Sequence, residues 1–217
     1  ILFIDDDCIA NNDWVERMSA ALEREPIVAG AVASPASNYI RLCHNIAEFH
    51  PFIPGCKRRP VEFIAGANMG FRRSVLDESG GFDEKVKTAE DMAFILRARS
   101  KGYRIYLACD AVVTHKHDRT TLGSVFGYAA KHASVTILLR NAYRSLLGTP
   151  FVLRSSFLTI MAAPLIALKV TLEIYMHNPR LAGLFWTAPL VYALKLAWCW
   201  GAACGLESNK RAKEIER

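Results

Sequence analysis

The sequence has 217 residues, of which 52% are hydrophobic, and a formal net charge of +6. A basic chain of this kind allows nucleic acid, anionic lipid or nucleotide phosphates as partners. Its six cysteines are scattered with no CxxC pair, which argues against a zinc ribbon or a disulfide scaffold and suits a reducing compartment. The sequence begins without a Met inside an apolar strand pattern, so we interpret it as a fragment that lacks its N-terminal part.

A short apolar run, residues 1–4, leads directly into three carboxylates. This pattern predicts a buried strand of an α/β sheet. Neighbouring carboxylates raise each other's pKa unless a cation compensates them, and α/β sheets bind ligands at the carboxyl ends of their strands. We therefore expect a divalent metal near Asp5 and Asp7, which share one side of an extended chain. The alternative is a solvated Asp-rich turn after an edge strand.

Residues 1–118 alternate apolar and polar segments separated by turn signals, as a soluble α/β domain does. The helical patterns cover residues 14–25, 39–49, 72–79 and 89–101. The strand patterns after the first cover residues 27–32, 61–65, 103–107 and 112–114.

Glu90 and Asp91 begin one of these predicted helices, where the helix dipole keeps a carboxylate ionised. An ionised Asp91 is a candidate general base, and the alternative is simple N-terminal capping. His115 follows a predicted strand, and its imidazole is a good ligand for a divalent metal. The alternative there is a surface pair with His117.

The small residues Gly66 and Ala67 follow another predicted strand and permit close approach of the backbone to a ligand. Asn68 both donates and accepts hydrogen bonds, which suits a sugar hydroxyl or a diphosphate oxygen. The alternative is a packing turn between a strand and a helix.

The C-terminal half has a different composition. Residues 119–148 interleave basic and apolar side chains, which predicts helices at a membrane interface, or else an ordinary packing helix. Residues 157–172 and 181–206 each approach or reach the ~20 apolar residues that cross a bilayer, with Lys169 and Lys195 as their charged residues. Basic residues flank the pair on both outer sides, so the positive-inside rule places both ends in the cytoplasm. The alternative is a pair of buried or interfacial helices.

The motifs of residues 1–118, taken in order, resemble family 2 glycosyltransferases of the GT-A fold. The matching segments are Asp5-Asp6-Asp7, Asn12-Asp13-Trp14-Val15, Gly66 to Arg73, Gly80 to Glu84, Glu90-Asp91-Met92, Arg97, Gly102-Tyr103 and Val113-Thr114-His115. The resemblance implies an α/β fold, the C-terminal part of a GT-A (Rossmann-like) domain, followed by an α-helical membrane hairpin. We expect this domain at 1–118, basic interfacial helices at 119–150, two transmembrane helices at 151–206 and a basic cytoplasmic tail at 207–217.

The resemblance also implies roles for the candidate residues. Asp7, Asp5 and His115 would hold Mg²⁺ or Mn²⁺, with Asp5 also near the donor, and Asp91 beside Glu90 would be the catalytic base. The pocket for the donor sugar and acceptor would be lined by Gly66, Ala67 and Asn68.

The expected reaction is an inverting transfer of a sugar from a nucleotide-diphosphate donor to a lipid-linked or cell-envelope glycan acceptor. The QxxRW signature of processive synthases is absent from the sequence, which favours single transfer. We expect a multi-pass protein of the inner (cytoplasmic) membrane, with its catalytic domain in the cytoplasm and no nucleic-acid partner. The alternatives are a metal-dependent phosphohydrolase, or an inactive fragment that acts only as a membrane module.

Overall fold

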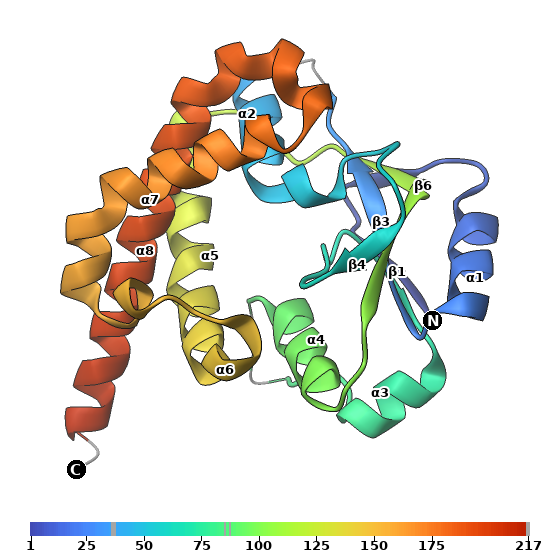
Figure 1. The fold of residues 1–217 in the computed structure, drawn as a ribbon, viewed down its shortest axis with the longest axis horizontal. Helices are drawn as coiled ribbons and strands as arrows, with labels where there is room; N and C mark the ends of the chain where they lie inside the picture. Colours follow the sequence, from blue (N-terminus) through green and yellow to red (C-terminus); the bar gives the residue numbers. More distant parts are fainter. Residues whose placement is uncertain (36–37, 85, 87, 216–217) are drawn as a thin grey trace. The chain divides into compact units, whose positions relative to one another are not determined.

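The computed structural model describes residues 1–35, 38–84, 86 and 88–215, with side chains described up to Arg211. The chain divides into two compact units (Figure 1). Unit 1 comprises Ile1–Ser37 and Phe49–Asp118, and unit 2 comprises Asn38–Glu48 and Arg119–Arg217. The short segment 38–48 therefore belongs to unit 2, although we expected it within a domain spanning 1–118. The last residues of the predicted basic tail, 216 and 217, lie outside the described residues.

Six strands form one sheet in the described part of unit 1, in the order β1-β5-β3-β6-β2 with β4 on β6. Their bounds are β1 Leu2–Ile4, β2 Cys8–Ala10, β3 Ile27–Ala33, β4 Arg59–Val61, β5 Asn68–Phe71 and β6 Ile105–His115. The pair β3–β6 is parallel and the other pairs are antiparallel, so the sheet is mixed.

The helices of unit 1 are α1 Trp14–Arg24, the 3-10 turn η1 His50–Phe52, α3 Arg73–Ser79 and α4 Glu90–Ser100. The core includes Met18, Phe71 and Phe94, and the rings of the last two are 4.7 Å apart. Burial of each such side chain contributes roughly 1.5–3 kcal/mol. The apolar side chains of α1 and α4 thus attach these helices to the sheet.

Two strand predictions were wrong in position. We expected a strand at residues 61–65, whereas β4 ends at Val61 and the next strand is Asn68–Phe71. Gly70 lies inside this strand. A side chain would not fit there, because a Cβ would be 2.8 Å from a methyl of Leu2 and 3.0 Å from the methyl of Met18. The glycine therefore allows close packing and does not mark a turn. The segments 103–107 and 112–114 belong to one long strand, β6, and β2 was not predicted.

Unit 2 is helical. It contains α2 Tyr39–Phe49, which begins in this unit and ends with Phe49 of unit 1, and then α5 Leu122–Ala142, α6 Arg144–Leu147, η2 Phe151–Arg154, α7 Ser156–Met176, η3 Pro179–Thr187 and α8 Ala188–Ile215. Both α5 and α7 pack against α8. Gly201 and Gly205 of α8 lie against the backbone of α5, since a Cβ on Gly201 would be 2.0 Å from the carbonyl oxygen of Ala130. Small residues at this spacing let two helices approach closely.

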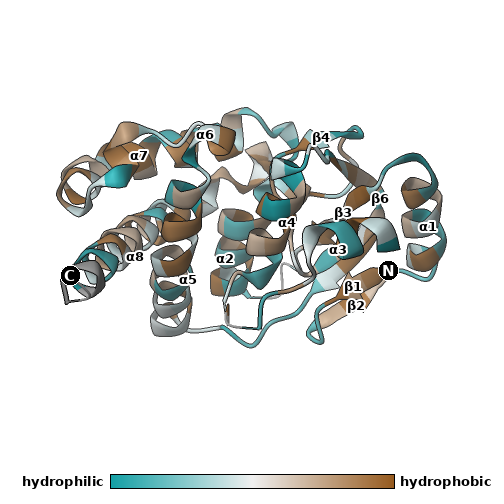
Figure 2. Cartoon of the chain, turned by 90° about the horizontal axis from the view of Figure 1, so that it is seen from below, coloured by the Kyte–Doolittle hydropathy of each residue, from teal (hydrophilic) through white to brown (hydrophobic). Residues whose placement is uncertain are grey.

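Two helical segments, Ser156–Met176 and Pro179–Arg211, are long and apolar enough to cross a membrane. Small residues of α7 such as Ala163 and Ala167 are buried. Seven of its large apolar side chains are exposed, namely Phe157, Ile160, Met161, Leu165, Leu168, Leu172 and Met176, whereas Ile174 and Tyr175 are buried. Brown marks much of α7 in Figure 2, as expected for a helix with an apolar outer surface.

Lys195 lies near the middle of the second apolar segment, where an unpaired charge is costly. Its ammonium group donates a hydrogen bond to the backbone oxygen of Ala47, 2.7 Å away in the last turn of α2. A cation at a helix C-terminus is stabilised by the helix dipole. The lysine thus has a partner within unit 2.

A disulfide joins Cys56 and Cys109. The scattered cysteines argued against a disulfide scaffold, and this bond was not predicted. The two residues are 53 positions apart and meet because Gly55 donates a backbone hydrogen bond to the Cys109 oxygen of β6. Disulfides are rare in reducing compartments, so this bond counts against the compartment inferred from the sequence.

Candidate functional site

The three N-terminal aspartates lie between β1 and β2 in unit 1. The chain turns sharply after Ile4, and the amide of Cys8 donates to the backbone oxygen of Asp5 at 3.1 Å. The next strand then pairs with the end of β6, with Cys8 opposite His115. The amide of Lys116 also donates to the Asp7 oxygen at 2.8 Å. Backbone pairing therefore brings the carboxylate-rich turn to the C-terminal end of β6.

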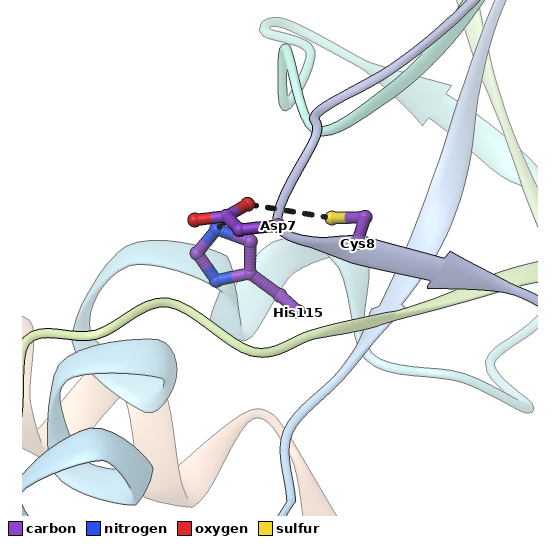
Figure 3. A group of neighbouring side chains, drawn as sticks. All are labelled: Asp7, Cys8 and His115. Carbon is purple, nitrogen blue, oxygen red and sulfur yellow. Dashed lines mark hydrogen bonds and ion pairs between the residues drawn. The ribbon is translucent and has the colours of Figure 1, made fainter.

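Asp7 and His115 are side by side at this point (Figure 3). His115 Nε2 is 3.2 Å from Asp7 Oδ1, and His115 is only 3% exposed. The His115 ring also contacts the ring of Phe49, with centroids 4.9 Å apart, which restricts its orientation. The Cys8 thiol also lies beside the Asp7 carboxylate, with its sulfur 4.0 Å from the same oxygen, Oδ1.

One potential ligand atom from each of Asp7, Cys8 and His115 lies within 4.8 Å of the other two. Burial, followed by the charges of Asp7 and Asp5, raises the pKa of the Cys8 thiol to about 12. A protonated thiol is a poor ligand, whereas carboxylate and imidazole suit Mg²⁺ or Mn²⁺. Asp7 and His115 therefore fit a hard cation as two protein ligands, and substrate oxygens and water would complete its coordination. Cys8 was not predicted, because its place opposite His115 depends on the unpredicted strand β2.

The carboxyl group of Asp5 belongs to the same electrostatic cluster. Partial burial of this carboxyl group is the largest cause of a raised pKa, about 6, followed by the charges of Asp7, Asp91, Asp6 and Glu90. The residue as a whole is exposed, so the cluster is open to solvent. Carboxylates that repel one another in this way attract a divalent cation.

Asp91 lies at the start of α4 with its carboxylate fixed in place. Its Oδ2 accepts a hydrogen bond from the backbone N–H of Gly66 at 3.0 Å, and its Oδ1 accepts from the N–H of Met92 at 2.7 Å. A Cβ on Gly66 would lie 2.8 Å from Oδ2, so only glycine leaves room for this arrangement. Ala89, just before the helix, has a φ of 60°, an uncommon and strained value for a non-glycine residue.

Glu90, the neighbour of Asp91, is exposed. Its charge contributes to the raised Asp5 pKa. The acidic residues predicted at 5–7 and at 90–91 therefore influence one another electrostatically, as a shared site requires.

Two predicted pocket residues are buried and do not face an open pocket. Ala67 is 2% exposed and Asn68 is 0% exposed. The Asn68 amide donates to the backbone oxygens of Ala31 and Ala111, each at 2.8 Å, and accepts from the indole N–H of Trp14 at 2.9 Å. Its hydrogen-bonding groups hold the sheet together. We expected Asn68 to line the substrate pocket, but it is buried inside the sheet.

Residues 1–201 match the model of a protein family described as glycosyl transferase family group 2. The chain belongs to this family. The ordered motifs of residues 1–118 predicted this family, and the family match confirms it.

Part of this chain is also similar to two curated relatives. The O-antigen chain rhamnosyltransferase RfbN of Salmonella typhimurium is 36% identical over 58 residues. The O-antigen chain rhamnosyltransferase WbaN of Salmonella anatum is 38% identical over 58 residues. Each alignment covers 27% of this chain and 18% of the relative, so the chain matches less than a fifth of either relative's length.

Proposed function

We propose that this glycosyltransferase moves a single sugar from a nucleotide-diphosphate donor to a hydroxyl of a lipid-linked or cell-envelope glycan, with inversion and with Mg²⁺ or Mn²⁺. The observation that carries the proposal is the cluster of Asp7 and His115, 3.2 Å apart, with Asp5 and Asp91 electrostatically coupled beside them. The names of the two relatives make rhamnose the first donor sugar to test. The lack of QxxRW supports single transfer.

The chain's own residues have distinct roles in this reaction. Asp7 and His115 would hold the cation, which when bound neutralises charge on the leaving diphosphate. Asp91 accepts the proton of the acceptor hydroxyl while the hydroxyl oxygen bonds to the anomeric carbon and the bond to the diphosphate breaks. The two backbone N–H groups that donate to Asp91 aim its carboxylate before substrate arrives. Displacement from the opposite side gives the inverted product.

Membrane association is supported by the two apolar helical segments of unit 2. We propose a multi-pass hairpin in the inner membrane with basic flanks on the cytoplasmic side. The Cys56–Cys109 disulfide opposes a cytoplasmic location of unit 1. Labelling of an exposed cysteine introduced at Asp77 with a membrane-impermeant maleimide, in cells and in inverted vesicles, distinguishes the two sides.

The test of activity uses the full natural chain in detergent with nucleoside-diphosphate rhamnose and other nucleotide sugars. Release of nucleoside diphosphate should require Mn²⁺ or Mg²⁺ and a glycan acceptor. It should fall at least 100-fold in Asp7→Ala and in Asp91→Asn. Asp77→Asn, which alters an exposed carboxylate of α3, is the matched control and should keep full activity.

Turnover that survives in a variant with both substitutions would contradict the proposal. Metal-dependent hydrolysis of phosphate monoesters would instead favour the phosphohydrolase. A two-metal site for that reaction has little support, because the described residues contain one possible ligand cluster, that of Asp7, Cys8 and His115. Failure of the folded wild type to turn over any donor, alone or with its natural neighbours, would favour a membrane module.

A further inference from the structure

An irregularity at residues 109–111, in the middle of β6, changes which side of the sheet the following side chains point to. Ala108 is opposite Gly30 of β3, but the next paired residue, Val112, is opposite Ala31. In a regular strand, residues four positions apart point to the same side. Here Ala108 and Val112 point to opposite sides, because their partners are adjacent in β3. The bulge therefore turns over the second half of β6.

This reversal decides where His115 points. Val113 is opposite Val32 of β3 and shares its face, and His115, two residues further on, shares it too. An uninterrupted β6 would put His115 on the opposite face, with Ile105. The Asp7–His115 distance of 3.2 Å therefore depends on the bulge.

Asn68 holds this bulge from inside the sheet. One amide nitrogen donates to the carbonyl oxygens of Ala31, in β3 beyond the irregularity, and of Ala111, in the bulge itself, both at 2.8 Å. A bulge disrupts the regular ladder of hydrogen bonds, and here the Asn68 amide bridges the two strands by donating to a carbonyl group of each.

Two neighbours fix the Asn68 amide in turn. The indole N–H of Trp14, on α1, donates to Asn68 Oδ1 at 2.9 Å. Gly30 leaves the space that the amide fills, since a Cβ there would lie 2.1 Å from Nδ2. The amide therefore has one orientation, set by its three hydrogen bonds.

We propose that Asn68 is a positioning residue for the metal site: by pinning the β6 bulge, it holds His115 against Asp7. The inference rests on the proposed function in one respect, namely that a divalent cation binds Asp7 and His115. Asn68 acts through the strand and does not touch the cation.

The test measures Mn²⁺ binding to the full chain in detergent by electron paramagnetic resonance. The spin-echo signal of a coordinated imidazole nitrogen reports His115 separately from affinity, and His115→Ala should abolish it. Asn68→Asp keeps the side-chain shape but removes both amide donors. It should raise the Mn²⁺ dissociation constant at least tenfold and weaken the imidazole signal.

Two further variants separate positioning from general stability. Of the three hydrogen bonds that hold the Asn68 amide, Trp14→Phe removes the one from the indole. It should weaken Mn²⁺ binding by a smaller factor, about threefold. Val75→Ala trims a fully buried core residue of α3 that takes no part in the hydrogen bonds of Asn68, and is the matched control. It should lower the unfolding temperature while leaving Mn²⁺ affinity and the imidazole signal unchanged.

The proposal is overturned if a folded Asn68→Asp, or Trp14→Phe where the former does not fold, binds Mn²⁺ with wild-type affinity and an intact imidazole signal. It is also overturned if Val75→Ala loses as much Mn²⁺ affinity as Asn68→Asp and Trp14→Phe do. Failure of the wild type to bind Mn²⁺ is a different result, because it removes the proposed metal site itself.

Discussion

Removal of the disulfide between Cys56 and Cys109 should strongly destabilise unit 1. The bond closes a loop of 53 residues, and the chain-entropy relation gives about 4 kcal/mol for a loop of that length. Since a domain is stable by only about 5–15 kcal/mol, this loss is a large part of the total. For a domain of this size it corresponds to a decrease of roughly 20 °C in unfolding temperature.

The assay follows hydrogen exchange of the peptides that contain residues 50–61 and 105–115, together with thermal unfolding of the full chain in detergent. A variant with Cys56→Ser and Cys109→Ser should exchange faster in both peptides, and dithiothreitol should have the same effect on the wild type. Cys204→Ser, which changes an exposed free cysteine, is the control and should behave as wild type. An unfolding temperature within 2 °C of wild type in the double variant would refute the reasoning.

Three other predictions concern the candidate site. Gly66→Ala places a methyl group against the Asp91 carboxylate, so sugar transfer should fall at least tenfold, measured as nucleoside diphosphate release, while Mn²⁺ affinity changes less than twofold. Asp91→Asn should likewise leave Mn²⁺ affinity within a few-fold of wild type by the resonance assay, because it does not hold the cation. The folded-state pKa of Asp5 is raised from 3.8 to about 6, so ionisation of Asp5 penalises the folded state. The unfolding free energy should therefore decrease as pH rises from about 4 to 6; a denaturation series should show a smaller decrease for Asp5→Asn and in the presence of Mn²⁺.

Local patterns predicted most elements of unit 1. The helix beginning at Trp14, the strand beginning at Ile27 and the helix beginning at Glu90 occur within one or two residues of their expected bounds. These segments combine a clear apolar period with polar or glycine boundaries, so neighbouring residues alone determine them. The apolar segments of unit 2 were clear for the same reason.

The sequence did not predict features that depend on contacts between distant segments. The turn at Asp5 to Cys8 leads into a three-residue strand that exists only because β6 lies beside it. Asn68 sits in a motif rich in small residues, and its polar amide suggested a ligand. Only the register of β3 and β6 reveals the bulge beside which the carbonyl groups of Ala31 and Ala111 accept hydrogen bonds from this amide.

The separation of α2 from its sequence neighbours has a consequence for biosynthesis. Its partner Lys195 is 148 residues further along the chain than Ala47. At 5–20 residues per second, a ribosome needs about 7 to 30 s to make that distance. During this interval α2 is complete but α8 is still being made, so the buried face of α2, which includes Leu42 and Ile46, must be protected by other means. The order of translation therefore makes the burial of α2 wait for the synthesis of α8.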